Sequence, residues 1–266
     1  MRKRALLLLL SLFLATTALA QWTTVSDGVA YQRFVRGTMD AHVVRVEVRN
    51  PKLRLLASRE SDRGLTVTEF AKKNDAIVAI NGDYFDKAMH TIGLAMGPCG
   101  VTDKPQEAIR RQAVVAVGKR RATIYEPRTP PTRKPRRWMN GAVSGWPMLV
   151  KECRALTAKE LPGSDHFTRA PHPRTAVGMS RDGRTMYLVV SDGRREGVPG
   201  LTLAELGAFL HDELGVCVAV NLDGGGSSAM WVRDRIVNKP SDPAERNVAN
   251  HLAVVAPADF PKCPRN

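Results

Sequence analysis

The sequence is poor in aromatic residues, and its histidines are widely scattered. Phe, Trp and Tyr make up 6% of the 266 residues and form no cluster beside a basic segment. Stacking on aromatic rings is a main source of affinity for single-stranded nucleic acid, so a nucleic-acid binder is disfavoured. The six histidines show neither HExxH nor another paired spacing, which gives a zinc site little support. We therefore predict no metal-ligand set and no cofactor, and a divalent cation stays open as an alternative.

Cysteine is scarce as well, and the chain has no CxxC pair. Its four cysteines are Cys99, Cys153, Cys217 and Cys263. Isolated cysteines in an exported chain favour disulfides over a zinc site. Four cysteines allow three pairings. The sequence leaves two alternatives of equal weight: two bridges, or one bridge with two buried thiols.

Acidic residues are outnumbered, with 26 Asp and Glu against 40 Lys and Arg, a net charge of +14. Three of the basic residues, Arg2–Arg4, precede the apolar run 5–14, and Ala18–Ala20 supplies small residues at a cleavage-site spacing. The run is too short for a membrane-spanning helix, and no later segment approaches that length. We therefore expect a signal peptide over 1–20 and an exported chain, periplasmic or secreted, with no membrane span. The mature chain keeps 37 basic against 26 acidic residues, or +11.

Two helices are predicted from their N-terminal signals. Thr66 with Glu69, and later Thr202 with Glu205, have the spacing of a capping box. The first predicts a short helix to residue 73. The second predicts a helix over 203–214, which a glycine ends.

Strands are predicted more often than helices. Alternating apolar and polar residues over 43–56, around an Asn-Pro-Lys turn, predict a hairpin with one solvated face. Apolar runs predict further strands at 76–80, 114–117, 176–179, 186–190, 216–222, 230–232 and 252–255. The prediction is therefore an α/β (α+β) chain: one domain over 21–266, with a mixed, strand-rich sheet and a few packed helices.

The segment 119–137 is rich in Lys, Arg and Pro and contains a single Glu. Such a composition is typical of a solvated surface loop. A basic solubilising loop is the favoured interpretation. The alternative is a patch that attracts a polyanion, such as a phosphorylated glycan or nucleic acid.

The most informative motif is the glycine run, Asp223-Gly224-Gly225-Gly226-Ser227-Ser228, which follows a predicted buried strand. Three glycines remove every Cβ near the backbone and allow positive φ, so that successive N–H groups can form an anion-binding nest. The two serines add hydroxyl donors. Asp223 adds a carboxylate at the end of a strand, where α/β sites gather. A tight turn without function is the alternative.

A second polar loop, Asn81-Gly82-Asp83-Tyr84-Phe85, also follows an apolar strand. If the extended backbone continues, Asn81 and Asp83 face the same side and both reach one ligand. Tyr84 or Phe85 would then form a stacking wall for a sugar ring. The alternative is an Asn-Gly turn with a buried aromatic residue.

Further candidates flank the later strands. Arg174 and Arg194 lie at the two ends of a predicted hairpin, and a guanidinium group matches phosphate oxygens in a bidentate fork. Asp192 offers another carboxylate there. Arg246 and Asn250 lie in the loop before the last strand. Ordinary surface ion pairs and loop residues are the alternatives.

Taken together, these motifs resemble the phosphodiester glycosidase family. The matching segments are AINGDYF at 79–85, GWPMLV at 145–150, PRTAVG at 173–178, SDGR at 191–194, NLDGGGSS at 221–228 and RNVANHL at 246–252. Where the family commonly shows Asn-Gly-Gly-Phe-Phe, this sequence has Asp83 and Tyr84, which weakens Asp83 as a residue shared by the family.

The resemblance implies hydrolysis of a sugar-1-phosphodiester on the glycosidic side, which releases free sugar and a phosphomonoester. Charge must then be stabilised on the phosphate, and a carboxylate must lie near the developing oxocarbenium ion. The expected phosphate ligands are Arg174, Arg194, Gly224, Gly225, Gly226, Ser227, Ser228, Arg246 and Asn250. The expected catalytic groups are Asp223 and Asp192 as carboxylates, Asn81 on a sugar hydroxyl, and Asp83 as a contributor.

Two other functions compete with this one. Residues 225–229 resemble the nucleophile elbow of a serine hydrolase, but the following segment 230–232 is predicted as a strand where the elbow requires a helix. A non-catalytic module that binds anionic phosphoglycans of the cell envelope would use the same basic groups without turnover. The sequence does not identify the sugar, the anomeric outcome or the oligomeric state.

Overall fold

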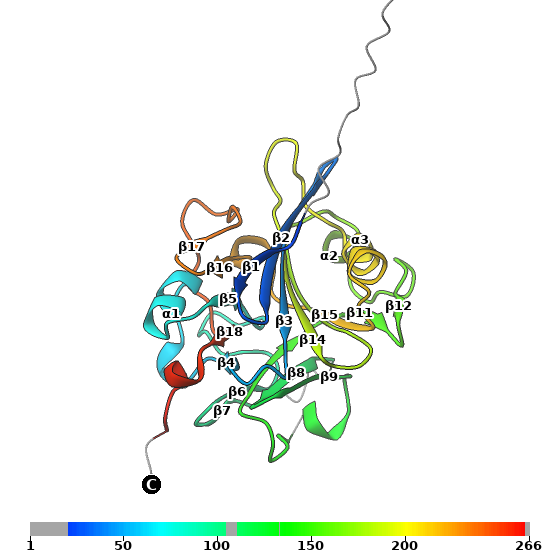
Figure 1. Cartoon of the computed structure of the whole chain (residues 1–266). Helices are drawn as coiled ribbons and strands as arrows, with labels where there is room; N and C mark the ends of the chain where they lie inside the picture. The colour runs from blue at the N-terminus through cyan, green and yellow to red at the C-terminus, as the bar shows by residue number, and fades with distance from the viewer. Residues whose placement is uncertain (1–20, 105–110, 133, 264–266) are drawn as a thin grey trace, which may run out of the picture.

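Three antiparallel β-sheets and three short α-helices make up the described part of the chain (Figure 1). The structure is a computed structural model that describes residues 21–104, 111–132 and 134–263. The signal peptide expected over 1–20 lies outside the described residues. The observed composition, many strands with a few packed helices in a single domain, confirms the predicted fold class.

The largest sheet has eight strands and carries most of the motifs named above. In spatial order they are β1 (Thr23–Ser26), β2 (Val29–Arg36), β3 (Met39–Glu47), β14 (Thr185–Ser191), β13 (Arg174–Met179), β15 (Val218–Asn221), β11 (Met148–Lys151) and β12 (Arg154–Ala155). The second sheet has the order β7 (Gly100–Asp103), β6 (Ala95–Gly97), β10 (Gly141–Gly145), β8 (Ala113–Gly118) and β9 (Arg121–Tyr125). The third has the order β17 (Arg235–Ile236), β16 (Met230–Val232), β5 (Val78–Asn81), β18 (His251–Val255) and β4 (Arg54–Ala57).

The helices are α1 (Val67–Lys73), α2 (Asp165–Thr168) and α3 (Leu203–Ala208). Both predicted capping boxes are confirmed, since Thr66 and Thr202 each accept the amide of the glutamate three residues on, and that glutamate accepts the amide of its threonine. The second helix differs from the prediction in one respect, because its last turn, Phe209–Glu213, is a π-helix. Short 3₁₀ turns lie at Glu60–Asp62, Pro130–Thr132, Gly225–Ser227 and Pro257–Asp259.

The largest sheet is buried on both faces. In β14, Leu188 and Val190 belong to a core shared by all three sheets, whereas Val189 packs in a second core beneath α3. This division follows from strand geometry, because successive side chains point to opposite faces. A third core lies between α1 and the sheet that contains β5. The sheets therefore hold the loops at their ends on a rigid frame.

The hairpin predicted over 43–56 is wrong, because its two strands do not pair with each other. Both segments form strands, but β3 pairs with β2 and β14, while β4 pairs with β18 in another sheet. One face of β3 was expected to be solvated, and Arg45 and Glu47 are exposed there as expected, whereas Val43 on the same face is fully buried because it packs in the second core. The turn therefore carries the chain between sheets. The other predicted strands are present.

The basic loop predicted over 119–137 is partly wrong as well. Its first half forms β9, which pairs with β8 and buries Ala122 and Ile124 in the main core. The alternation in this short strand was masked by the charged residues on either side. The rest of the segment contains the 3₁₀ turn at Pro130–Thr132.

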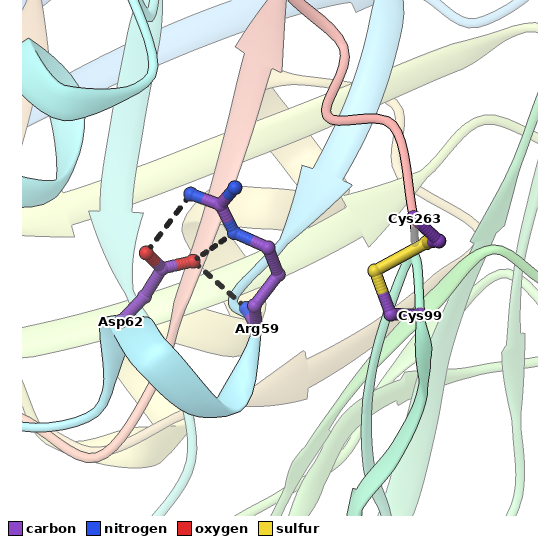
Figure 2. Close-up of a disulfide and its surroundings, with 4 residues drawn as sticks. All are labelled: Arg59, Asp62, Cys99 and Cys263. Carbon is purple, nitrogen blue, oxygen red and sulfur yellow. Dashed lines mark hydrogen bonds and ion pairs between the residues drawn. A yellow bond between two sulfur atoms is a disulfide. The ribbon is translucent and has the colours of Figure 1, made fainter. Parts of the chain in front are cut away.

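Both disulfides are present, which decides between the two alternatives for the cysteines. Cys153 pairs with Cys217, and Cys99 pairs with Cys263. The second bridge fastens the C-terminal segment to the turn between β6 and β7 (Figure 2). Figure 2 also shows Arg59 forked on the buried carboxylate of Asp62, which closes the 3₁₀ turn before α1. Among the described residues, no helix has the length and apolar character needed to span a membrane.

Candidate active site

One cavity gathers the glycine run and three arginines at one end of the largest sheet. The glycine run follows β15, Arg174 opens β13, and Arg194 lies in the loop after β14. Because β13 lies between β14 and β15 and runs antiparallel to both, the start of β13 meets the ends of the other two. The cavity has a volume of about 320 Å³ and is lined by Tyr84, His166, Phe167, His172, Arg174, Arg194, Asp223, Gly224, Gly225, Gly226 and Arg246.

The glycines are required by the close approach of basic side chains and backbone. A Cβ on Gly224 would lie 2.8 Å from the carbonyl oxygen of Pro173. Gly225 has φ of +60°, and a Cβ there would lie 3.0 Å from the Arg194 guanidinium. A Cβ on Gly226 would lie 2.2 Å from Arg246 Nη2. The triple-glycine bend and the arginines therefore meet, as the motifs predicted.

The expected anion-binding nest of successive amides is wrong for most of the run. The Gly224 amide donates to the Asp223 carboxylate at 2.9 Å, and the Gly225 amide donates to the Pro173 carbonyl at 2.8 Å. The amides of Ser227 and Ser228 donate to carbonyls within the run itself. These bonds hold the turn closed, so the capacity to bind an anion rests chiefly on the arginines.

Arg174 is almost fully buried and is held by backbone carbonyls. Its Nε donates to Leu201 O at 3.0 Å, and Nη2 donates to Phe167 O at 2.7 Å and Ala170 O at 3.1 Å. Burial and, to a smaller extent, the charge of Arg194 together lower the pKa of this guanidinium to about 10, while Tyr84 opposes the shift. No carboxylate of the described residues pairs with Arg174. A buried cation without an anionic partner is costly, so an anionic ligand in the cavity would stabilise it.

Two more guanidinium groups line the same cavity. Arg194 is exposed, has φ of +57°, and forms no ion pair with the described carboxylates. Arg246 pairs with Asp242, with 2.8 Å between Nε and Oδ2, and lies 3.4 Å from the Ser227 hydroxyl. Three cations around one hollow match the geometry and charge of a phosphate group.

Asp223 is the carboxylate of this cavity. Burial raises its pKa to about 6, although hydrogen bonds from Ser227 and the Gly224 amide, together with the charge of Arg246, act in the opposite direction. A carboxyl group with a pKa near 6 exchanges a proton readily near neutral pH, which suits a general base or acid.

Aromatic side chains also line the cavity. Tyr84 lines the cavity as predicted, and its hydroxyl donates to Trp146 O at 3.1 Å. Phe167 lines the cavity as well, with Trp146 stacked on it at 5.2 Å between ring centroids. Phe85 is not part of the expected stacking wall, since it is not among the residues that line the cavity. Such rings provide a surface for the apolar face of a sugar.

Sequence reasoning missed Phe167 and two histidines. His166 and Phe167 belong to α2. The one signal in the sequence that could have found them is that they lie a few residues before Arg174. His172 Nε2 lies 3.0 Å from the His166 carbonyl, which can only accept, so in the neutral ring Nδ1 is an acceptor. That Nδ1 is buried and has no partner among the described atoms. Burial lowers the pKa of His172 and keeps the ring neutral.

Asn81, Asp83 and Asn250 lie behind the cavity and do not line it. Asn81 is fully buried, and its amide donates to the Asp223 carbonyl at 2.7 Å. Asp83 accepts from Ser144 N at 2.7 Å and from Asn250 Nδ2 at 3.0 Å, and burial raises its pKa well above the ordinary value. The expectation that Asn81 and Asp83 face one ligand is wrong, because the Asn81 amide contacts the Asp223 carbonyl, whereas the Asp83 carboxylate contacts Ser144 and Asn250.

The two serines of the glycine run are also buried. Ser227 hydrogen-bonds Asp223 and Arg246, and Ser228 accepts from the Thr175 hydroxyl at 3.2 Å. Neither hydroxyl lines the cavity, so the expectation that both bind phosphate directly is not supported by their positions. The run leads into β16, not into a helix, which argues against a nucleophile elbow.

Asp192 lies behind the glycine run, away from the cavity wall. It is 2% exposed and accepts from Arg195 Nη2 at 3.0 Å and Lys239 N at 3.0 Å. Asn238 Nδ2 donates both to Asp192 Oδ1 at 3.2 Å and to Ser228 O at 3.1 Å. The sequence analysis expected Asp192 to be a catalytic carboxylate. Its contacts show instead that it supports the glycine run through Asn238 and does not face the cavity where a sugar would bind.

Asp192 also belongs to a buried group that has the residue types of a metal site. Asp40, His42 and Asp192 offer ligand atoms within 4.8 Å of one another. His42 Nε2 has no hydrogen-bond partner among the described atoms. However, Arg195 Nη2 bridges the two carboxylates, at 2.5 Å from Asp40 and 3.0 Å from Asp192, and Arg33 forks on Asp40. These two guanidinium groups already balance the two carboxylates, so the group does not need a cation for neutrality.

Comparison with known proteins places these features in a family. The family model described as phosphodiester glycosidase matches residues 74–255, more than half of the chain, and this range contains every residue that lines the cavity.

Among relatives, the chain is 28% identical over 220 residues to bovine N-acetylglucosamine-1-phosphodiester alpha-N-acetylglucosaminidase, covering 76% of this chain and 40% of the relative. It is 35% identical over 111 residues to the prophage-derived protein YomE of Bacillus subtilis, covering 42% and 17%. The chain therefore spans less than half the length of these curated relatives.

Solved structures share the fold. The zebrafish N-acetylglucosamine-1-phosphodiester alpha-N-acetylglucosaminidase catalytic domain, auto-inhibited by its pro-peptide, matches with a TM-score of 0.67 and 19% identity, covering 90% of this chain and 84% of that chain. A hypothetical protein from Synechocystis matches with a TM-score of 0.68 and 17% identity, covering 90% and 64%.

Proposed function

The chain belongs to the phosphodiester glycosidase family, and on that premise we propose that it is an exported hydrolase that cleaves the glycosidic bond of a sugar-1-phosphodiester. The products are free sugar and a phosphomonoester. The observation that carries the proposal is the cavity in which Arg174, Arg194 and Arg246 surround the glycine run and Asp223.

Each part of the cavity has a role in this reaction. The three guanidinium groups hold the phosphate and stabilise the charge that it gains when the C1–O bond breaks. Tyr84 and Phe167 contact the sugar ring. His172 Nδ1, an acceptor without a partner among the described atoms, takes a hydrogen bond from a sugar hydroxyl.

Asp223 acts on the sugar side of the bond. Its carboxylate takes a proton from water as the water oxygen bonds to C1, and the electron pair of the C1–O bond leaves with the phosphate. A phosphomonoester is a weakly basic leaving group, so the reaction requires less help from an acid than ordinary glycoside hydrolysis. Asn81, through its bond to the Asp223 carbonyl, positions this residue.

Two observations support export. The chain forms two disulfides, which persist in an oxidising compartment. The basic and apolar N-terminal pattern over 1–20 is that of a signal peptide. We propose the periplasm or the medium as its location.

The test uses the mature chain and a panel of sugar-1-phosphodiesters, among them a UDP-linked and a nitrophenyl derivative of N-acetylglucosamine 1-phosphate. Free sugar and phosphomonoester are measured for wild type, Asp223→Asn and the matched exposed control Asp212→Asn. We expect turnover in wild type and control and a loss of about 10²-fold or more in Asp223→Asn. Saturable binding without turnover would favour the non-catalytic phosphoglycan module instead. Full activity of Asp223→Asn would refute the assigned role.

A further inference from the structure

A second basic cavity lies at the far end of the largest sheet. It has a volume of about 480 Å³ and is lined by Arg49, Arg120, Arg121, Ala122, Thr123, Asp182 and Gly183, which we call the basic cleft. β13 runs from Arg174 in the candidate cavity to Met179, and the turn after it holds Asp182. At about 3.3 Å per residue, the two cavities are roughly 20 Å apart along the sheet. Figure 1 shows β8 and β9 in the lower half of the molecule and α2, which borders the candidate cavity, to the right and above them.

The fold brings three turns together at this end. Arg120 lies in the tight turn between β8 and β9, where Gly118 pairs with Arg121. Glu47 at the end of β3 pairs with Thr185 at the start of β14, and the Val48 amide donates to Arg184 O at 2.8 Å. The turns therefore meet because their strands are packed in register, although they lie far apart in the sequence.

The arginines of the basic cleft lack acidic partners. Arg49, Arg120 and Arg121 are all exposed, and the described residues offer none of them a carboxylate within ion-pair distance. The one carboxylate of the cleft, on Asp182, accepts from the Ser180 hydroxyl at 2.6 Å and from the Arg184 amide at 3.0 Å. Because no described carboxylate lies within ion-pair distance of these three guanidinium groups, their positive charges add up and attract an anion.

The basic surface continues beyond the cleft. The Arg121 guanidinium lies 4.4 Å from the centroid of the Trp138 ring. Trp138 directly follows Arg136 and Arg137, and these two residues line a further hollow of about 300 Å³ with Lys134. The surface therefore offers cations along a path, which fits an extended anion better than a single ion.

We propose that the basic cleft binds a phosphate of a polymeric substrate, a glycan whose sugars are joined through phosphodiesters, while another phosphodiester of the same polymer occupies the candidate cavity. This inference rests on the proposed function and specifies its substrate class. Guanidinium forks match phosphate oxygens, and a second contact on one polymer raises affinity by making binding intramolecular.

The surroundings of the cleft favour a glycan over a membrane or a nucleic acid. The large exposed apolar residues of the described chain are Val35 and Val101, and neither lines the cleft to insert into lipid. The aromatic ring next to the cleft, Trp138, has the Arg121 guanidinium stacked over one face, and no aromatic residue among those described lines the cleft itself as a platform for successive bases.

The experiment compares the mature wild-type chain with Arg49→Gln/Arg120→Gln. The control, Arg36→Gln/Arg154→Gln, removes the same charge from two exposed arginines that pair with Glu213 and Glu160, outside both cavities. Binding is measured directly with a labelled poly(hexosamine 1-phosphate) of about 20 repeats, which requires no turnover. The same glycan without phosphate, a short DNA duplex and phosphatidylglycerol vesicles serve as competing ligands.

We expect the cleft variant to bind the polymer roughly tenfold more weakly and the control to bind within twofold of wild type. On the polymer, the KM of the cleft variant should rise by a similar factor with kcat unchanged, while both constants for a small sugar-1-phosphodiester stay the same. Equal weakening in the control would overturn the inference, because net charge alone would then explain binding. Tighter binding of DNA or vesicles than of the polymer would also overturn it. Polymer binding that weakens in the cleft variant as expected, without turnover of any substrate by wild type, would refute the proposed function and leave the cleft assignment intact. Polymer binding by the cleft variant equal to that of wild type would overturn the cleft assignment.

Discussion

Replacing Asp223 by asparagine should stabilise the protein while it removes activity. In the fold the pKa of Asp223 is about 6, against an ordinary 3.8. Between these values the folded state binds a proton that the unfolded state has released, so stability falls as pH rises through this window. Above pH 6 the ionised carboxylate costs the fold at most about 3 kcal/mol.

Asparagine removes this cost and keeps the contact that closes the turn. Its side-chain oxygen can still accept the Gly224 amide, which now donates at 2.9 Å. We therefore expect Asp223→Asn to be more stable than wild type by about 1 to 3 kcal/mol at pH 8 and equally stable at pH 3.5. For a chain of this size that gain corresponds to a rise in Tm of roughly 2 to 10 °C.

The assay is thermal unfolding of wild type and variant at several pH values with both disulfides intact, beside the activity measurement. Asp212→Asn, at an exposed position, is the control and should show no pH-dependent difference from wild type. If the difference between Asp223→Asn and wild type is the same at pH 3.5 and pH 8, the carboxylate is not destabilised by its surroundings. The case for a proton-exchanging carboxyl in the cavity would then fail.

Three further predictions concern the frame around the cavity. Arg174→Lys keeps the charge but replaces the planar fork by a single nitrogen, which cannot occupy both the Nε and the Nη2 positions that contact the three carbonyls. We therefore expect kcat/KM to fall by about 10-fold or more. Steady-state kinetics measure this, far-UV circular dichroism checks that the variant is folded, and wild-type activity would contradict it. Gly224→Ala places a Cβ 2.8 Å from Pro173 O, so we expect the free energy of unfolding, measured with denaturant, to fall by about 1 to 3 kcal/mol. An unchanged unfolding midpoint would contradict this and show that the turn relaxes to accept the methyl group. His251 is fully buried and stacked on Phe70, and burial lowers its pKa from 6.5 to about 4. Between pH 6.5 and 4 the unfolded state binds a proton that the folded state does not, so His251 should lower the free energy of unfolding by up to about 3 kcal/mol as pH falls through this range. His251→Gln should lack this pH-dependent loss, which is measured as the difference in unfolding free energy between variant and wild type at several pH values. A difference that stays constant with pH would refute the prediction.

The glycine run shows how far a motif can be interpreted. Its place after a strand and its bend were predicted from the residues, its closeness to Arg174 and Arg194 was implied by the family resemblance, and all three are confirmed. The use of its amides was not predicted correctly. Glycine permits both a nest and a closed turn, and the acceptors that decide between them, such as Pro173 O, come from a segment about fifty residues earlier.

Local sequence determined the local structure of this protein. Capping boxes at Thr66 and Thr202 placed α1 and α3, and runs of apolar residues placed the predicted strands, because hydrogen bonds and side-chain periodicity act over a few residues. The strand β9 and the helix α2 were missed because their local signals are weak. Tertiary structure alone decided which strands pair, that Asp192 supports the glycine run from behind, and that the turn at Arg120 meets the turn at Asp182. These outcomes depend on sheet order and on contacts between residues far apart in the chain, and no local pattern records which distant surface each strand will cover.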